Sequence, residues 1–261
     1  TDEVYADKDF FRAEDDTVNF TIPLLGLFNF SKGQYMVMNI IVFILFLLMF
    51  ALEGVRGRLK AIKVFKASLA ILGIGIGVLV LGELIAYLCA LISGAKFKLF
   101  GVMHGVSFDN VAMIVSVALM ALVCVAVYIS GRNKAIRKVS GSMRASAASN
   151  AAAKYAFNSL YGTLALMFFL SAVLLFALGE NLMFFIPLTF AAAALILYRL
   201  TSLKLWMLCA IALILLHAFS FLYALAMALT IGAFGAVAML AFFDIMVLVP
   251  MADIYLSSNK K

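Results

Sequence analysis

Three ionisable side chains stand inside long apolar stretches of this sequence, where a charge is costly. Glu83 occurs in LGELIAY with Tyr87 one helical turn further, His217 occurs in LLHAFS, and Asp244 occurs in FFDIMVLVP. If their three helices meet, these groups could relay protons or hold a cation. The favoured alternative is a set of interhelical hydrogen bonds that locks a helix bundle. Glu83, Tyr87, His217 and Asp244 are therefore kept as a candidate intramembrane polar cluster.

No catalytic or metal-binding constellation is visible elsewhere in the chain. A zinc site needs three or four His, Cys or acidic ligands at helical or hairpin spacing. The two histidines, His104 and His217, are far apart in the sequence, and there is no HExxH motif. The three cysteines stand singly inside apolar runs and are expected to be buried small hydrophobic groups: Cys89, Cys124 and Cys209. No catalytic or metal-ligating residue is predicted in this chain.

The composition argues against a water-soluble globule. Hydrophobic residues make up 66% of the 261 residues, charged residues make up 13%, and the mean hydropathy is +1.14. A soluble domain usually has about 25% charged residues. The net charge of +7 could suggest nucleic acid, but the cations stand at the ends of apolar runs. The cytoplasmic bias of Lys and Arg and the attraction of anionic headgroups account for that placement. The expected partner is the lipid bilayer and not nucleic acid.

Seven apolar runs predict an all-α, polytopic bundle of about seven membrane-spanning helices, because each run can cross a hydrocarbon core about 30 Å thick. The runs cover residues 35–53, 67–93, 110–130, 156–178, 182–200, 205–229 and 232–256. Together they form a predicted membrane domain over residues 35–256. The last three runs are divided at short breaks, so six or eight helices remain alternatives.

Prolines and glycines inside these runs predict how the helices pack. Pro187 and Pro250 are expected to start or kink helices and so to free carbonyl groups that neighbouring helices must satisfy. Four glycines in ILGIGIGVLVLGEL predict close contact between helices through small residues: Gly73, Gly75, Gly77 and Gly82.

The distribution of Lys and Arg over the loops predicts the topology. Residues 54–66 contain five of them and residues 131–155 contain six, and both loops are placed in the cytoplasm. With the cations near the last helices, fifteen lie on this side and five on the other. The N-terminus is therefore predicted outside and the C-terminus inside. The 131–155 loop is expected to be either a short interfacial helix or a solvated linker. A bacterial inner membrane is the first expectation and the endoplasmic reticulum membrane the alternative.

The two ends of the chain lie outside the predicted spans. Residues 1–34 form an acidic extracytoplasmic lead-in, in which Thr17–Ser31 is expected to be an extended or short-strand segment. Residues 257–261 are expected to be a short cytoplasmic tail. The first residues resemble a linker from the middle of a protein, so a fragment or a processed product is expected.

Three local patterns resemble one family. Val18–Phe28 reads VNFTIPLLGLF, Asn181–Phe190 reads NLMFFIPLTF, and Phe243–Met251 reads FDIMVLVPM. They are similar to apolar segments of the membrane-anchored zinc exopeptidases of metallopeptidase family twenty-eight, the aminopeptidase Y/S-like group that includes the endoplasmic-reticulum metallopeptidases. Pro187 and Pro250 stand at matching prolines.

In that family an extracytoplasmic di-zinc peptidase domain precedes a multi-helix membrane domain. The resemblance therefore implies that this chain anchors and orients a zinc-dependent aminopeptidase-like domain whose zinc ligands would lie upstream of Thr1. No catalytic or metal residue carries over to this chain, and Asn19 departs from the Tyr usual in the family. The alternative functions are a small-solute or ion/proton transporter using Glu83, His217 and Asp244, and an assembly partner in a larger membrane complex. An oligomer remains open.

Overall fold

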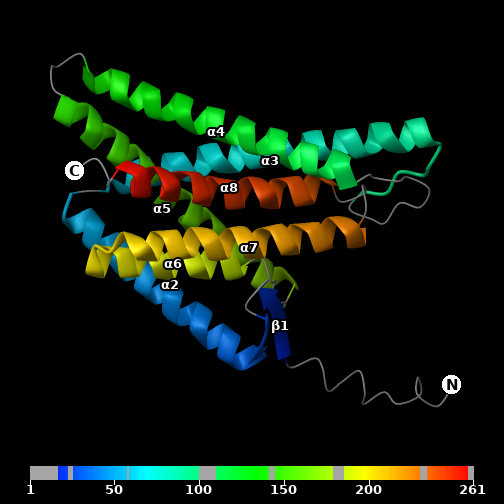
Figure 1. Ribbon diagram of the computed structural model, residues 1–261, viewed down its shortest axis with the longest axis horizontal. Coiled ribbons are helices and arrows are strands. Elements are labelled where there is room, and N and C mark those ends of the chain that lie inside the picture. The colour runs from blue at the N-terminus through cyan, green and yellow to red at the C-terminus, as the bar shows by residue number, and fades with distance from the viewer. Residues whose placement is uncertain are drawn as a thin grey trace.

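The computed structural model describes residues 17–22, 26–57, 59–99, 110–140, 145–178, 185–229 and 234–257. Within these residues the chain is predominantly helical, with one two-stranded hairpin and seven helices (Figure 1). The strands are β1 (Thr17–Ile22) and β2 (Gly26–Ser31). The helices are α2 (Lys32–Val55), α3 (Ala61–Ser93), α4 (Asn110–Ser140), α5 (Ala145–Leu178), α6 (Phe185–Thr201), α7 (Lys204–Leu229) and α8 (Phe234–Ser257).

The N-terminal segment that was expected to be extended is an antiparallel hairpin, whose register runs from Thr17 opposite Ser31 to Ile22 opposite Gly26. Ser31 then caps α2. Its hydroxyl accepts a hydrogen bond from the Gln34 N–H at 3.2 Å, and the Gln34 side-chain oxygen accepts one from the Ser31 N–H at 3.1 Å. This reciprocal capping box satisfies two N–H groups that have no helical partner, so α2 begins directly at the end of the hairpin.

Helix α8 lies at the centre of the bundle and packs against α3, α4, α5 and α7, whereas α2 packs against α6. The helices alternate in direction, so the C-terminal ends of α2, α4, α6 and α8 lie at one end of the bundle with the N-terminal ends of α3, α5 and α7 (left in Figure 1). We call this the basic end. Its Lys and Arg residues are Arg56, Lys60, Lys63, Lys66, Arg132, Lys134, Arg137, Lys138, Lys154, Arg199 and Lys204.

The hydrophobic core is centred on α5 and α8. Tyr161 and Leu164 of α5 and Phe242 and Met251 of α8 are almost completely buried. The ring of Phe46, from α2, stacks on Tyr161 with a centroid distance of 5.6 Å. The outer helix α2 is therefore joined to the core by an aromatic contact, while most of its large apolar side chains remain exposed.

The predicted helical class is confirmed, because all seven predicted ranges coincide with or overlap a helix of the described chain. The predicted 131–155 loop is wrong. Helix α4 continues to Ser140 and α5 already begins at Ala145, so neither a separate interfacial helix nor a solvated linker fills this range. The alanines of 145–153 have high helix propensity, which lets α5 begin before its apolar portion, and the Lys and Arg residues of 132–138 are also good helix formers, which lets α4 continue past its apolar run.

Two of the four predicted glycine contacts are correct. A Cβ on Gly82 would lie 2.5 Å from the Gly235 Cα, and one on Gly75 would lie 3.0 Å from the Phe243 ring. The prediction for Gly73 and Gly77 is wrong, because a Cβ there would meet nothing within 4 Å. At 3.6 residues per turn, positions two residues from Gly75 lie on nearly the opposite side of α3.

Within the described residues, two helices are long and apolar enough to cross a membrane, α3 and α8. Shorter apolar stretches occur at Ile40–Val55, Ala191–Thr201 and Lys204–Leu216. Two such helices are weak evidence by themselves, because the core helix of a soluble protein can have the same composition. Helix α3 differs from such a core helix, since only 28% of its most apolar window is buried, compared with 61% for α8.

Several predicted features lie outside the described residues. They are residues 1–16 of the acidic lead-in, His104, and residues 258–261 of the tail. Ser257, which was predicted to begin the tail, is the last residue of α8. The expected burial of the three free cysteines holds for Cys124 but is wrong for Cys209, which is exposed, and Cys89 is half-buried.

Candidate functional site

Glu83 lies where α3 crosses the beginning of α8. Its Oε1 accepts a hydrogen bond from the backbone N–H of Gly235 at 3.2 Å, in the first turn of α8. The first N–H groups of a helix have no helical partner and carry partial positive charge, so a carboxylate is favourable there. The contact requires close approach of the two backbones, which Gly82 and Gly235 permit. These contacts favour the interhelical hydrogen-bonding interpretation of Glu83.

The other members of the predicted polar cluster are placed differently. Asp244 is buried on α8, nine residues after Gly235 and therefore about 13 Å further along the helix. Tyr87 is exposed, and its ring packs edge-on against Phe97 with a centroid distance of 5.4 Å. His217 lies in α7, but its side chain is outside the described part of the chain. The described contacts do not join Glu83 to Asp244, and the complete cluster remains a prediction.

Pro250 lies inside α8, where it cannot donate to the carbonyl of Met246 four residues earlier. The buried hydroxyl of Thr163, on α5, is 3.3 Å from that carbonyl oxygen and 2.9 Å from the Ser159 carbonyl of its own helix. A neighbouring helix thus offers the proline-freed carbonyl a donor, whose single proton is shared with the Ser159 carbonyl. Pro187 lies in the first turn of α6, near the beginning of that helix, where proline is tolerated.

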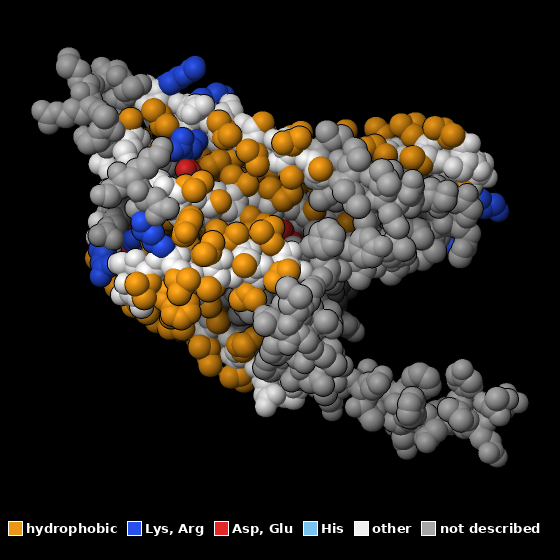
Figure 2. All heavy atoms as spheres, in the orientation of Figure 1, with side chains coloured by type: hydrophobic (Ala, Val, Ile, Leu, Met, Phe, Trp, Pro, Cys, Tyr) orange, Lys and Arg blue, Asp and Glu red, His pale blue; other side chains and the backbone are white. Residues whose placement is uncertain are grey.

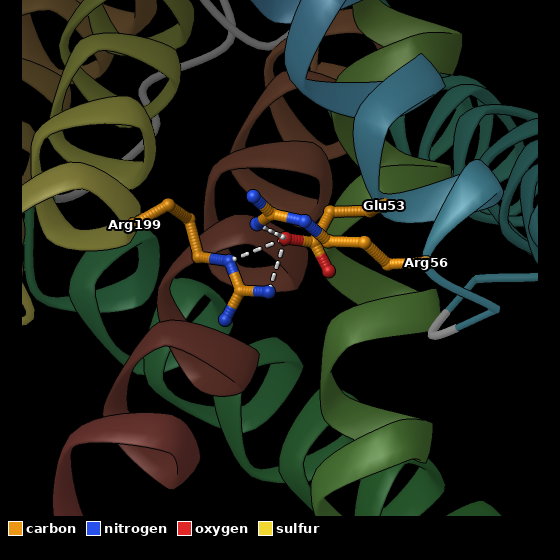
Figure 3. A network of polar contacts seen from close by, with 3 residues as sticks. All are labelled: Glu53, Arg56 and Arg199. Carbon is orange, nitrogen blue, oxygen red and sulfur yellow. Dashed lines mark hydrogen bonds and ion pairs between the residues drawn. The ribbon is translucent and has the colours of Figure 1, made fainter.

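At the basic end, Glu53 and Arg199 form a buried ion pair between α2 and α6 (Figure 3). Arg199 Nε is 3.0 Å from Glu53 Oε1, and a second guanidinium nitrogen contacts the same oxygen. Arg56 approaches this carboxylate at 3.9 Å from an exposed position. The Arg199 guanidinium also lies 5.1 Å from the centroid of the Phe157 ring, so α5 takes part in the contact.

Asp253 forms a second polar contact at this end. Its Oδ2 accepts a hydrogen bond from the Tyr128 hydroxyl at 2.8 Å and forms an ion pair with Arg132 Nε at 2.9 Å. Both partners lie on α4, so Asp253 joins α4 to α8. Of the acidic residues in the described chain, the two at the basic end, Glu53 and Asp253, are therefore both engaged with arginines.

A cavity of about 1070 Å³ opens at the basic end between α3, α4 and α5. Five lysines line it, contributed by all three helices: Lys63, Lys66, Lys134, Lys138 and Lys154. No carboxylate of the described chain forms an ion pair with any of them. By sequence, residue 58, between α2 and α3, and residues 141–144, between α4 and α5, contain no Asp or Glu. The positive charge of the cavity is therefore not compensated by the described protein.

The cavity changes from cationic to apolar along its length. On α3 the lining runs from Lys63 and Lys66 through Ala70 to Ile74. On α4 it runs from Lys138 and Lys134, near the end of the helix, back to Val127. Lys66 and Ile74 are eight residues apart, which is about 12 Å along a helix. The cavity consequently has a charged mouth and an apolar limb.

Polar groups of α5 form the inner wall of the cavity. Asn158 is only 9% exposed and Ser159 only 5%. The side-chain oxygen of Asn158 is buried and has no hydrogen-bond partner in the part of the chain that the structure describes. Since buried polar atoms are normally paired, this amide marks a position where a ligand could bind.

Sequence reasoning missed this cavity. The sequence attributes the lysines of 54–66 and 131–155 to topology and to anionic headgroups in general, and a short interfacial helix or a linker at 131–155 predicts no cavity between helices. Once it is helical, Lys134 and Lys138 lie one turn apart on α4, and this spacing was the signal that could have identified the lining.

No protein-family description, curated protein or solved structure matches this chain. In the described residues, no three His, Cys, Asp or Glu side chains lie together as a metal site would require. The five lysines beside an apolar surface suit the described site to the recognition of negative charge.

Proposed function

We propose that this chain is a seven-span helical membrane domain with its N-terminus outside and its C-terminus in the cytoplasm. The observation that carries the proposal is the charge difference between the two ends of the bundle. The basic end has eleven Lys and Arg residues, whereas the opposite end of the described chain has Lys32, Lys96 and Lys98. Figure 2 shows most of the cations of this face at one end and an apolar surface beside them. Cations beside spanning helices resist translocation, so the basic end is assigned to the cytoplasm.

The exposed apolar surface supports the proposal. Large aliphatic side chains of α2 and α3 are about half exposed, including Ile41 at 52%, Leu48 at 55%, Ile76 at 49% and Val80 at 59%. In water such a surface costs about 25 cal/mol per Å² of apolar area, and it would cause aggregation. In a bilayer the same surface faces hydrocarbon, so its exposure has no free-energy cost of this kind.

We further propose that the domain anchors and orients an extracytoplasmic zinc-dependent aminopeptidase-like domain. The proposal rests on the resemblance of Val18–Phe28, Asn181–Phe190 and Phe243–Met251 to segments of the family-twenty-eight peptidases. The position of the hairpin supports it, because β1 and β2 lie beside the beginning of α2, away from the basic end (Figure 1). A chain segment entering through this hairpin would come from the outer side.

Single-cysteine labelling tests the topology. In a background with Cys89→Ala, Cys124→Ala and Cys209→Ala, a cysteine replaces either Lys60 or Lys96, which are exposed at opposite ends. A membrane-impermeant maleimide should label Lys96→Cys in intact cells or right-side-out vesicles, and Lys60→Cys only in inside-out vesicles. Labelling of both positions from the same side would contradict the proposal.

The anchoring role is tested on the native polypeptide, purified from its membrane with an antibody raised against this chain. We expect a larger polypeptide with an aminopeptidase activity that a zinc chelator abolishes and added zinc restores. A native polypeptide without chelator-sensitive aminopeptidase activity would contradict this role while leaving the seven-span topology intact.

A further inference from the structure

We propose that the lysine-lined cavity between α3, α4 and α5 binds the phosphate-bearing headgroup of an anionic phospholipid. The phosphate would lie among the lysines at the mouth, and an acyl chain would follow the apolar limb toward Ile74. The site goes beyond the proposed anchoring role, and it depends on the proposed topology only for assigning the lipid to the cytoplasmic leaflet.

Charge is the first argument. Five lysines from three helices converge on one cavity, and the described acids at this end, Glu53 and Asp253, are engaged with Arg199 and Arg132. Converging cations repel one another unless an anion lies between them. Lysine is a strong point-charge binder of phosphate, and basic pockets between membrane helices are suited to anionic headgroups.

The lining of the cavity distinguishes a lipid from a free anion. A soluble phosphate would need only the charged mouth, whereas this cavity continues along α3 past Ala67, Ala70 and Ile71 to Ile74. The lining thus follows the order of groups in a phospholipid, from headgroup to hydrocarbon. The volume of about 1070 Å³ is at the upper end of ordinary ligand pockets and can hold a headgroup with the first part of a chain.

The buried amide of Asn158 adds a specific polar contact. Its side-chain oxygen lies in the inner wall without a hydrogen-bond partner among the described residues. A hydrogen-bond donor of a bound molecule that reaches this depth would satisfy the oxygen. Phosphatidylglycerol carries net negative charge and matches the five lysines better than a zwitterionic lipid, whose terminal cation they would repel.

The test is native mass spectrometry of the purified protein in neutral detergent, with phosphatidylglycerol and phosphatidylcholine of equal chain length added separately. Three proteins are compared: the unaltered chain, a cavity variant (Lys66→Gln, Lys134→Gln, Lys138→Gln), and a matched control (Lys60→Gln, Lys96→Gln, Lys98→Gln) whose lysines do not line the cavity. Both variants lose the same charge, and circular dichroism verifies that each retains its helices.

We expect one tightly bound phosphatidylglycerol in the unaltered chain and in the control. In the cavity variant the affinity should fall by about fivefold for each lysine removed, on the order of 100-fold in total. Equal loss in the cavity variant and the control, or equal binding of both lipids to the unaltered chain, would overturn the proposal.

Two further measurements separate a lipid site from a site for free phosphate. Ala70→Phe fills the apolar limb while leaving the lysines in place, and it should weaken phosphatidylglycerol binding at least tenfold. Soluble glycerol 3-phosphate, added at the same concentration as the lipid, should displace little of it. Unchanged lipid binding in Ala70→Phe, or complete displacement by the soluble phosphate, would show that no chain occupies the limb and would overturn the assignment to a lipid.

Discussion

The hydroxyl of Thr163 lies 3.3 Å from the carbonyl oxygen of Met246, the carbonyl that Pro250 leaves without its helical donor. The contact joins α5 to α8 at the centre of the bundle, where Thr163 is completely buried. A proline inside a helix is costly because it removes one hydrogen bond and distorts the turn before it. Here a side chain of the neighbouring helix offsets part of that cost.

Thr163→Val removes the hydroxyl but keeps the shape of the side chain. We expect the free energy of unfolding in mixed micelles to fall by about 1 kcal/mol, the usual size of an interhelical hydrogen bond in a membrane protein. In a Pro250→Ala background, residue 250 regains an N–H for Met246, so the same Thr163→Val change should cost only a few tenths of a kcal/mol. Equal costs in the two backgrounds would show that the contact does not compensate for the proline.

Gly235→Ala should destabilise the α3–α8 crossing. A Cβ at this position would collide with the Leu79 carbonyl oxygen and with the Glu83 side chain. We expect a loss of about 1–3 kcal/mol on thermal or denaturant unfolding, as for other overpacked positions. Gly77→Ala on α3 is the matched control, because its Cβ meets open space, and it should leave stability unchanged or raise it. A loss in the control as large as that of Gly235→Ala would contradict this account.

The Glu53–Arg199 ion pair should be more important for stability than its exposed neighbour. Glu53→Gln leaves the largely buried Arg199 without its carboxylate, and we expect a loss of about 3 kcal/mol or more. Arg56→Gln removes an exposed partner at 3.9 Å and should cost less than about 1 kcal/mol. A loss for Arg56→Gln equal to that for Glu53→Gln, measured by chemical unfolding, would show that the buried pair has no special role.

The lengths of the apolar runs were sufficient to predict the helices. Seven long hydrophobic runs, separated by charged or small residues, are compatible with few folds other than a bundle of helices. Particular contacts could not be predicted in the same way. Pro250 predicts a carbonyl group without a helical donor. Which side chain approaches that carbonyl depends on the rotation and depth of α5, which place Thr163 beside Met246. Glu83 was correctly recognised as unusual, but its contact with Gly235 depends on where α8 begins.

The cavity illustrates a different reason for failure. The lysines of 54–66 and 131–155 were visible as charge, but a loop has no defined faces. When α4 extends to Ser140 and α5 begins at Ala145, Lys134, Lys138 and Lys154 acquire fixed directions and converge. The cavity could be predicted only if α4 and α5 were expected to continue as helices beyond their apolar runs.

The central claim is that the bundle spans a bilayer, and a cysteine scan along α3 in reconstituted vesicles tests it most directly. In the cysteine-free background, Ile62, Leu69, Ile76, Val80 and Leu91 are replaced one at a time; all are exposed in the structure. An aqueous maleimide should react fastest at Ile62→Cys, which lies outside the run 67–93, and more slowly at Leu69→Cys and Leu91→Cys, which lie near its two ends. It should fail at Ile76→Cys and Val80→Cys, whose thiols would lie in hydrocarbon. Reaction at all five positions at similar rates would place the exposed face of α3 in water and contradict the account.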